Sequence, residues 1–269
     1  MKILSRTYLW LVLALLYAPI LVLVIFSFNE GGSLSNYTGF SFRWYGELFR
    51  DKVALTSLKN SLLLALSSAA IATVLGTFAS LGLDRMRHRT LKTAITSATN
   101  VPMMNPDIVT GVSMMLLFVA LGGILGLQNV LGRWTMLIAH VTFSLPYVIL
   151  SILPRFRQFD SSLREAALDL GCTPVRSFFK VELPSILPGV ISGFVMGFTL
   201  SLDDFVISHF VSSPNFQTLP LYIYNQTAHD VKYSMYALCT LIIVTILVLL
   251  LTVNFAGGAG MKKRKEGKK

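Results

Sequence analysis

Long apolar runs dominate the pattern of hydrophobic and polar positions along the chain. An α-helix needs about 20 apolar residues to cross a hydrocarbon core about 30 Å thick, where it satisfies its own backbone hydrogen bonds. Six runs approach or exceed this length, at about residues 8–28, 61–83, 93–121, 134–153, 186–211 and 235–255. We therefore predict an all-α membrane protein with six transmembrane helices, forming a single domain over residues 1–269.

Four of the runs contain no Lys, Arg, Asp or Glu, whereas the third and the fifth are interrupted. The third contains Pro102 and Pro106, and the fifth contains the adjacent carboxylates Asp203 and Asp204. Proline removes a backbone donor and clashes with the preceding turn, and broken membrane helices lie where protein or water satisfies the freed groups. Both runs are therefore predicted to be kinked or broken helices.

The composition supports this class of protein, and the charge distribution predicts its orientation. Apolar residues make up 54% of the chain and charged residues 13%, which is about half the charged fraction of a soluble domain. Of the 23 Lys and Arg residues, 17 lie in residues 1–7, 84–92, 154–185 and 256–269. Because basic residues accumulate on the cytoplasmic side, both termini are predicted to be cytoplasmic. This bias also explains the net charge of +10, which therefore does not indicate a nucleic-acid partner.

The hydrophilic segment of residues 154–185 carries the signals of two short helices. Ser162 and Glu165, three residues apart, match a capping box and predict a helix start. Gly171 predicts the end of that helix, and the Thr-Pro pair after it supplies the cap and first residue of another. We therefore predict a helical elbow between the fourth and fifth spans.

The first helix of the elbow is predicted to have one small apolar face. Its members, at i, i+3, i+4 and i+7, are Leu163, Ala166, Ala167 and Leu170. Alanine permits close backbone approach, so this face is suited to dock another protein. The alternative is that the elbow only caps the membrane domain.

Several stretches resemble one known family. "EAALDLG" is separated by nine residues from "VELP", and together they resemble the EAA loop of binding-protein-dependent ABC importer permeases. Val181 stands where that loop usually has isoleucine. The spermidine/putrescine branch of the family is similar to this chain in "FSFN", "RWYGELF", "NPDIVTGVSMMLLFVALG", "AHVTFSLPYV", "TLSLDDFVISHFV" and "TLPL".

The resemblance implies a MetI-like ABC importer permease that crosses the lipid bilayer of a bacterial cytoplasmic membrane several times. It also implies three kinds of partner: a second permease subunit (PotB-like or PotH-like), two ATPase subunits (PotA-like) and an external polyamine-binding protein (PotD-like). The elbow would rest in a cleft of the ATPase and move the fourth and fifth spans. The coupling residues implied are Leu163, Glu165, Ala166, Ala167, Gly171 and Pro184.

The sequence contains no G-x-x-x-x-G-K-[ST] loop, which cradles phosphates in many ATPases. We therefore expect that the chain is not an enzyme and holds no cofactor, with ATP and Mg²⁺ bound by the partner ATPase. No spacing typical of metal ligands occurs. Two interpretations of Glu165 stay open, a helix cap and a direct contact with the partner.

Three acids are the only charged residues inside the runs: Asp107, Asp203 and Asp204. A charge at membrane depth costs at least about 2.5–3.5 kcal/mol and normally faces a protein or water-filled interior. At about 1.5 Å per residue, Asp107 and Asp203 lie roughly 22–24 Å from the cytoplasmic ends of their runs, so the acids are predicted to form one layer. Alternatively, they restart two broken helices, through "NPD" and through a capping box from Ser201 to Asp204.

An acidic layer near aromatic rings suits polyamines, because carboxylates bind the ammonium groups and aromatic faces cover the methylenes. The predicted substrate pathway is Asp107, Asp203, Asp204, Trp44, Tyr45 and Phe205. For Trp44 and Tyr45 the alternative is an interfacial aromatic belt. The function predicted from these features is a polyamine (spermidine/putrescine) permease subunit. Alternatives are a permease for another organic cation, a self-sufficient proton-coupled carrier or channel, and an intramembrane hydrolase using the aspartate pair.

Small residues recur at four-residue intervals in the fifth run, at Gly189, Gly193, Gly197 and Ser201. Such a stripe lets two helices pack closely. The alternative is that the same face lines the interface with the second permease subunit, with Asp204 directed into the pathway.

Overall fold

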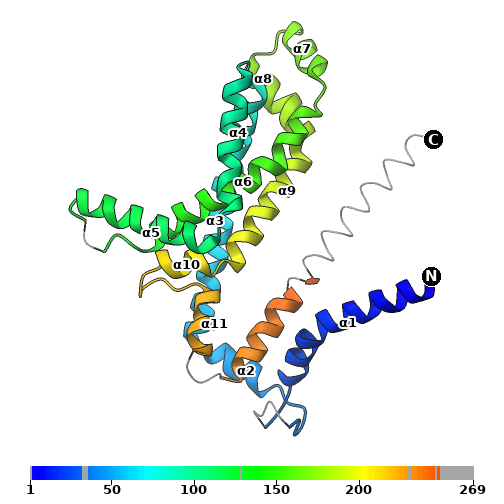
Figure 1. The fold of residues 1–269 in the computed structure, drawn as a ribbon, viewed down its shortest axis with the longest axis vertical. Helices are drawn as coiled ribbons and strands as arrows, with labels where there is room; N and C mark the ends of the chain where they lie inside the picture. The colour runs from blue at the N-terminus through cyan, green and yellow to red at the C-terminus, as the bar shows by residue number, and fades with distance from the viewer. Residues whose placement is uncertain (1, 32–35, 128, 229–231, 246, 249–269) are drawn as a thin grey trace. The chain divides into compact units, whose positions relative to one another are not determined.

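The computed structural model describes residues 2–31, 36–127, 129–228, 232–245 and 247–248. Helices form nearly all of the regular structure in these ranges (Figure 1). The only extended pairings among the described residues are two isolated bridges, Asn29 with Phe40 and Ser213 with Phe216. The predicted all-α class is therefore confirmed.

Residue contacts divide the chain into two compact units. The first combines Met1–Leu55 with Asn225–Lys269, and the second is Thr56–Tyr224. Both boundaries fall inside helices, α3 (Lys52–Arg85) and α11 (Leu219–Thr227). The single domain over residues 1–269 stays a prediction.

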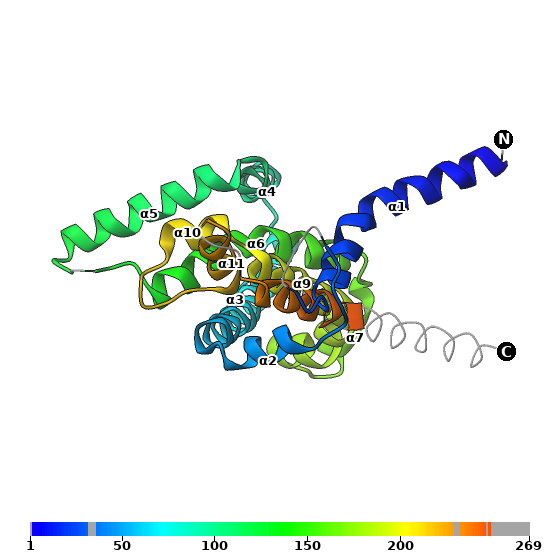
Figure 2. The same ribbon diagram turned by 90° about the horizontal axis from the view of Figure 1, so that it is seen from below.

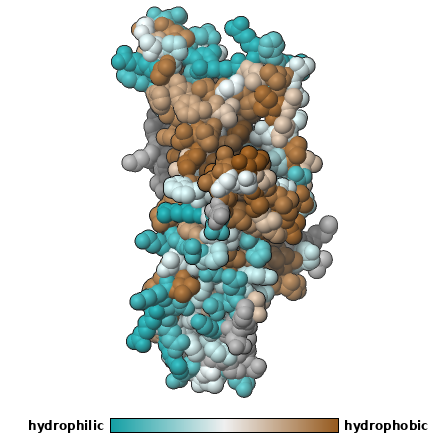
Figure 3. Space-filling view, turned by 90° about the vertical axis from the view of Figure 1, so that its left-hand side faces the viewer, coloured by the Kyte–Doolittle hydropathy of each residue, from teal (hydrophilic) through white to brown (hydrophobic). Residues whose placement is uncertain are grey.

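Five described helices are long and apolar enough to cross a membrane. They are Arg6–Phe26 within α1 (Lys2–Phe26), Lys52–Arg85, Asp107–Ile124, Arg133–Arg157 and Pro174–Asp203. A hydrophilic end that carries α7 (Ser161–Asp169) stands above a hydrophobic surface in the space-filling view (Figure 3). The predicted sixth span begins as a shorter apolar helix, Ser234–Thr245, and its remainder lies outside the described residues together with the basic tail.

The third predicted span is broken, as expected from its prolines. α4 (Arg89–Met104) ends before Asn105, and α5 (Asp107–Ile124) begins after Pro106, so α5 alone is long enough to span. The predicted cap is displaced by one residue. Pro106, rather than Asn105, is the capping position, because its carbonyl accepts the first hydrogen bonds of α5, from the amides of Val109 and Thr110.

The fifth predicted span is broken too, but its predicted bounds of 186–211 are wrong at both ends. Helical backbone begins at α8 (Pro174–Ser177) and continues through a five-residue π-helix, η1 (Phe178–Glu182), into α9 (Leu183–Asp203). It stops at Asp203, and a separate short helix, α10 (Val206–Val211), follows. The second helix of the elbow and the fifth span therefore form one continuous helical segment.

The centre of the second unit is the contact between α6 (Arg133–Arg157) and α9. Gly189, Gly193 and Gly197 are buried there, and a methyl group added at Gly193 would lie 3.2–3.4 Å from Val148 and Ile152. The glycine stripe therefore packs α9 against α6 within this chain. The alternative, that this face lines the interface with a second permease subunit, is wrong because α6 already covers it.

Replacing Gly193 with leucine is expected to destabilise the protein by about 1–3 kcal/mol, because the added side chain overpacks the contact between α6 and α9. The measurement is thermal unfolding of the purified protein in detergent. Gly82→Leu in α3 is the matched control, since a side chain there meets nothing within 4 Å. Equal unfolding temperatures for the two variants would show that the contact between α6 and α9 accommodates a large side chain at position 193.

Candidate functional site

The break between α9 and α10 is organised by Asp204. Its Oδ1 accepts a hydrogen bond from the amide of Ile207 at 3.3 Å, and its Oδ2 accepts one from the amide of Ser208 at 2.8 Å. These are the orphan amides at the start of α10, so Asp204 caps that helix. The capping box predicted from Ser201 to Asp204 is wrong, because Ser201 lies inside α9 with its hydroxyl directed to another helix.

A buried histidine joins this break to α6. His140 is 1% exposed, with Nδ1 2.7 Å from the Ser201 hydroxyl and Nε2 3.2 Å from the Ser208 hydroxyl. Nε2 also lies 3.5 Å from Oδ2 of Asp204. The hydroxyl of Ser68, on α3, donates to that of Ser201 at 2.9 Å. One polar network therefore connects α3, α6, α9 and the cap of α10.

Sequence reasoning missed His140. Its signal was present, because it is the only histidine in an apolar run free of Lys, Arg, Asp and Glu. A polar side chain in such a run must find a partner, since an unsatisfied polar group in hydrocarbon costs several kcal/mol. The sequence analysis considered only the acidic residues inside the runs, so it did not identify His140.

The two adjacent acids occupy different surroundings. The Asp204 side chain is 6% exposed, whereas Asp203 is exposed. Helical backbone ends between the two residues, because Asp203 is the last residue of α9 and Asp204 is extended, and one carboxylate faces the network while its neighbour faces outwards. Asp203 is thus the acid of this pair that is available to a cation.

A cluster of aromatic rings begins two residues after this exposed carboxylate, at Phe205. The ring of Phe205 is 4.7 Å from that of Tyr224 and 5.4 Å from that of His209, measured between ring centres. Tyr224 is 48% exposed. The break therefore presents a carboxylate and an aromatic surface within a few residues of each other.

Asp107 stands at the other helix break. It is the first residue of α5 and is exposed. Both ribbon views place α5 beside α10 (Figures 1 and 2), and a methyl group added at Gly111 would lie 3.5 Å from the backbone of Ile207. Asp107 lies four residues before Gly111, and Asp204 lies three residues before Ile207. Each acid is therefore about one helical turn before the contact between α5 and α10. This placement is compatible with the predicted acidic layer.

A cavity of about 240 Å³ lies next to this second break, between α4, α5 and α6. Its polar lining is Asn105, Thr110, Ser113 and Thr142, and apolar side chains including Met114 and Phe143 complete the wall. The sequence analysis did not find it, because it combines three helices that are separate in the chain.

Trp44 lies in α2 (Arg43–Arg50) and is turned into the first unit, where it is 9% exposed. Its indole N–H donates to the carbonyl of Asn29 at 2.6 Å. The guanidinium of Arg43 lies 5.1 Å from the centre of its ring, and the ring of Tyr233 also lies 5.1 Å from it. The ring is already in contact with a cation of this chain, so its placement favours neither a substrate wall nor a lipid-facing belt.

Tyr45 has a similar internal role. Its hydroxyl lies 2.9 Å from that of Ser27. Its ring lies 5.2 Å from Phe28 and 5.9 Å from Phe42, between centres. We therefore do not place Tyr45 or Trp44 in the pathway.

The elbow forms as predicted, but its first cap is different. Asp160, rather than Ser162, caps α7, accepting a hydrogen bond from the Ser162 amide at 3.0 Å. Hydrogen bonds from Ser162 hold the pKa of Asp160 below its usual range. Glu165 therefore has no capping role. It is exposed, and it has no hydrogen bond or ion pair within the described part of the chain.

Gly171 ends α7 in the left-handed conformation, with φ +85°. The amide of Gly171 donates to the carbonyl of Leu168 at 2.9 Å, and that of Cys172 donates to Ala167 at 3.0 Å. This is a Schellman motif. Thr173 then caps α8, its hydroxyl accepting from a backbone amide at 3.3 Å. The predicted end of one helix and start of the next are confirmed.

Three of the four residues on the predicted apolar face are exposed. Leu163 is 51% exposed, Leu170 is 86% exposed, and Ala166 is exposed between them. Ala167 is 8% exposed and faces inwards, so its predicted role in docking is not favoured. Pro184 is exposed as the second residue of α9.

A partly buried ion pair that the sequence analysis missed ties the elbow to α3. Nη2 of Arg85 lies 2.6 Å from Oε1 of Glu182, and Glu182 is 2% exposed. Glu182 directly precedes the Leu-Pro pair of the elbow motif. Its partner lies 97 positions away, so the sequence did not reveal the pair.

Comparison with known proteins agrees with this geometry. Residues 72–257 match the family model described as "Binding-protein-dependent transport system inner membrane component". The putrescine transport system permease protein PotI of Escherichia coli K12 is 43% identical over 228 residues, covering 85% of this chain and 81% of PotI. The spermidine/putrescine transport system permease protein PotC of Haemophilus influenzae is 40% identical over 246 residues, covering 91% of this chain and 93% of PotC.

One solved structure shows the same fold. It is a bacterial ABC transporter involved in the import of the acidic polysaccharide alginate, with a TM-score of 0.76 and 15% identity. The alignment covers 94% of this chain and 95% of the other. The chain belongs to the family of inner-membrane components of binding-protein-dependent transport systems. It is a transport permease that passes several times through the cytoplasmic membrane.

Replacing His140 with leucine is expected to lower the stability of the protein by about 1–3 kcal/mol, because buried polar atoms around it lose their partners. His209→Leu is the matched control, since His209 is exposed on α10. The measurement is thermal unfolding in detergent. An equal effect of the two substitutions would show that the network does not hold the break together.

Proposed function

We propose that this chain is the permease subunit of an ATP-driven polyamine importer and that it forms part of the substrate pathway. The observation that carries the proposal is the exposed carboxylate of Asp203 at the same helix break as Phe205, whose ring lies against that of Tyr224. An ammonium group pairs with a carboxylate, and an aromatic face covers the adjacent methylenes. The names of the relatives, permeases for putrescine and for spermidine/putrescine, support the same substrate class.

The two acids of the break have different tasks in this proposal. Asp204 is committed to the α10 cap and to His140, so it holds the break in shape. Asp203 meets the cation, and Asp107 offers a second exposed carboxylate at the neighbouring break. An exposed carboxylate binds only weakly, which suits a pathway because a transported cation must also leave.

The energy for import comes from partner subunits in this proposal. They are a second permease subunit, a pair of ATPase subunits that bind ATP and Mg²⁺, and an external polyamine-binding protein. The family description, which names binding-protein-dependent transport, supports the external partner. The exposed face of α7, with Leu163, Ala166 and Glu165, is the surface we assign to the ATPase.

The continuous helical segment supplies the mechanical connection. It runs for 30 residues, from the first residue of α8 to Asp203, which is about 45 Å at 1.5 Å per residue. A movement imposed on the elbow is thus transmitted along α9 to the break that carries Asp203. The Arg85–Glu182 pair fixes the near end of this segment to α3.

Asp203→Asn is expected to lower the initial rate of putrescine uptake about tenfold or more, because hydrogen bonds to charged groups contribute about 1.5–3 kcal/mol. Its unfolding temperature should stay close to that of the unmodified protein. Asp204→Asn is the matched comparison: asparagine still caps α10, but the contact with His140 loses its charge, so stability should fall. The measurement is ATP-driven uptake by the assembled complex in proteoliposomes, with complexes matched for composition. Unchanged uptake in the Asp203 variant would show that this carboxylate is not part of the pathway. Faster uptake of another organic cation than of putrescine by the unmodified complex would overturn the proposed substrate class.

Ala166→Glu is expected to abolish copurification of the ATPase subunits while the permease still inserts and folds. A bulky charge on the exposed face of α7 prevents close approach of a partner. Ser161→Glu, at the first residue of the same helix, is the control, because an acid is favoured at a helix start. Normal copurification and ATP-driven uptake in the Ala166 variant would show that this face is not the coupling surface.

A further inference from the structure

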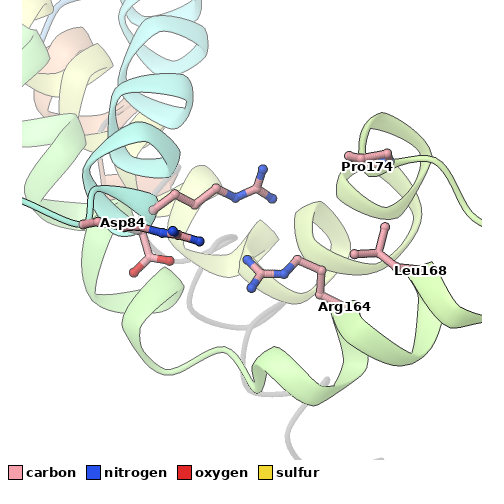
Figure 4. Close-up of a pocket in the computed structure, with 6 residues that line it drawn as sticks. Asp84, Arg164, Leu168 and Pro174 are labelled. Atoms are coloured by element: carbon pink, nitrogen blue, oxygen red, sulfur yellow. The ribbon is translucent and has the colours of Figure 1, made fainter.

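A cavity of about 470 Å³ lies between the end of α3 and the elbow, and the proposed function does not use it. Its lining residues are Asp84, Arg85, Arg87, Arg164, Leu168 and Pro174. Figure 4 shows Arg164 reaching from α7 into the space that faces the end of α3, with Leu168 and Pro174 along its far side. Three guanidinium groups from two separate parts of the chain thus meet around one space.

The arginines of the cavity differ in what they already bind. Arg85 is paired with Glu182. Arg87 and Arg164 have no hydrogen bond or ion pair within the described part of the chain. Asp84 is the only acid in the lining. After the pairing of Arg85, the lining keeps a net positive charge, and its two free guanidinium groups can each offer paired donors to an anion.

The position of the cavity along α3 is that of a membrane boundary. Asp84 and Arg85 are the first charged residues after an apolar run that begins at residue 61. Phe78 lies seven residues before Arg85, on the same face of α3, and is 53% exposed. Phe179, on η1, is 54% exposed. The ring of Phe178 lies 6.1 Å from that of Phe78 and 5.1 Å from that of Phe179, between centres. Exposed apolar rings therefore lie beside the charged cavity, and Phe78 is about two helical turns below Arg85, as an acyl chain lies beneath a headgroup.

The cavity is on a different side of α7 from the surface assigned to the ATPase. At 100° per residue, Arg164 and Leu168 are centred about 150° from Leu163, Ala166 and Leu170. A partner on the exposed apolar face therefore does not have to enter the cavity. This separation favours a ligand that arrives from the membrane.

We propose that this cavity binds the phosphate of an anionic phospholipid headgroup. Guanidinium groups bind phosphate through paired hydrogen bonds, and basic pockets between membrane helices bind such headgroups. The lipid bridges Arg87, after α3, and Arg164, on α7, so it steadies the elbow at the level where α9 begins. Inorganic phosphate shares this chemistry but lacks the acyl chains that Phe78 and Phe179 would contact. The inference does not depend on which substrate the permease carries.

The test compares lipid retention by two double variants of the complete permease, each purified with its partner subunits in detergent containing phosphatidylglycerol. Arg87→Gln with Arg164→Gln removes both free guanidinium groups and leaves the Arg85–Glu182 pair intact. Arg89→Gln with Arg176→Gln removes the same charge from exposed positions outside the lining and is the control. Native mass spectrometry measures the phosphatidylglycerol bound at each lipid concentration.

The unmodified and control proteins should bind phosphatidylglycerol with similar affinity, and the cavity variant about 30-fold more weakly, since each basic residue contributes about 1 kcal/mol. Phosphatidylcholine should be retained weakly by all three proteins. Equal phosphatidylglycerol binding by the cavity and control variants would overturn the proposal. So would displacement of the lipid by millimolar inorganic phosphate, which would make the site one for a free anion. Binding of the lipid only after the ATPase subunits are removed from the complex would also overturn it and assign the cavity to that partner.

Discussion

The close approach of α9 to α6 is the contact on which the rest of the second unit depends. Three glycines let side chains of α6, including Val148 and Ile152, pack directly against the backbone of α9, and Ser201 continues the same stripe one turn further on. Only a small residue at that position lets His140 reach across from α6, and Nδ1 meets the serine hydroxyl at 2.7 Å. The histidine in turn stands against Asp204, the cap of α10. The stripe of small residues on α9 thus determines the position of the polar network. The network in turn determines the position of the helix break.

In two pairs of neighbouring residues, one member has a structural role while the other is exposed to a ligand or partner. Asp204 is enclosed and shapes the break, while Asp203 faces outwards. On α7, Ala167 packs inwards while Ala166 lies on the exposed face. The 100° step of the helix separates the two alanines of α7, whereas the two aspartates differ because helical backbone ends between them. A pair of identical side chains in a sequence therefore does not indicate two identical roles.

The sequence predicted the features that depend on local chemistry. Apolar runs indicated the spans, prolines and acids indicated the two breaks, and Gly171 indicated the end of α7. Caps were less well predicted, since several residues near a helix start can accept the same amides, and Asp160 was chosen over Ser162. Contacts between distant residues were not predicted at all. Glu182 and Arg85 each have ordinary neighbours in the sequence, and only the folded chain brings them within 2.6 Å.

The π-helix between α8 and α9 has a consequence for how this protein tolerates change in length. In η1 the amide of Leu183 donates to the carbonyl of Phe178, five residues back, so one turn contains an additional residue. Deleting one residue there would restore a regular α-helix, in which each amide bonds to the carbonyl four residues back. The wide turn and its additional residue would be lost together, so the elbow and the glycine stripe would keep nearly the same angle to each other. The π-helix therefore accommodates one additional residue without changing the alignment of the two surfaces, and a change in length by one residue disturbs that alignment least at this point of the chain.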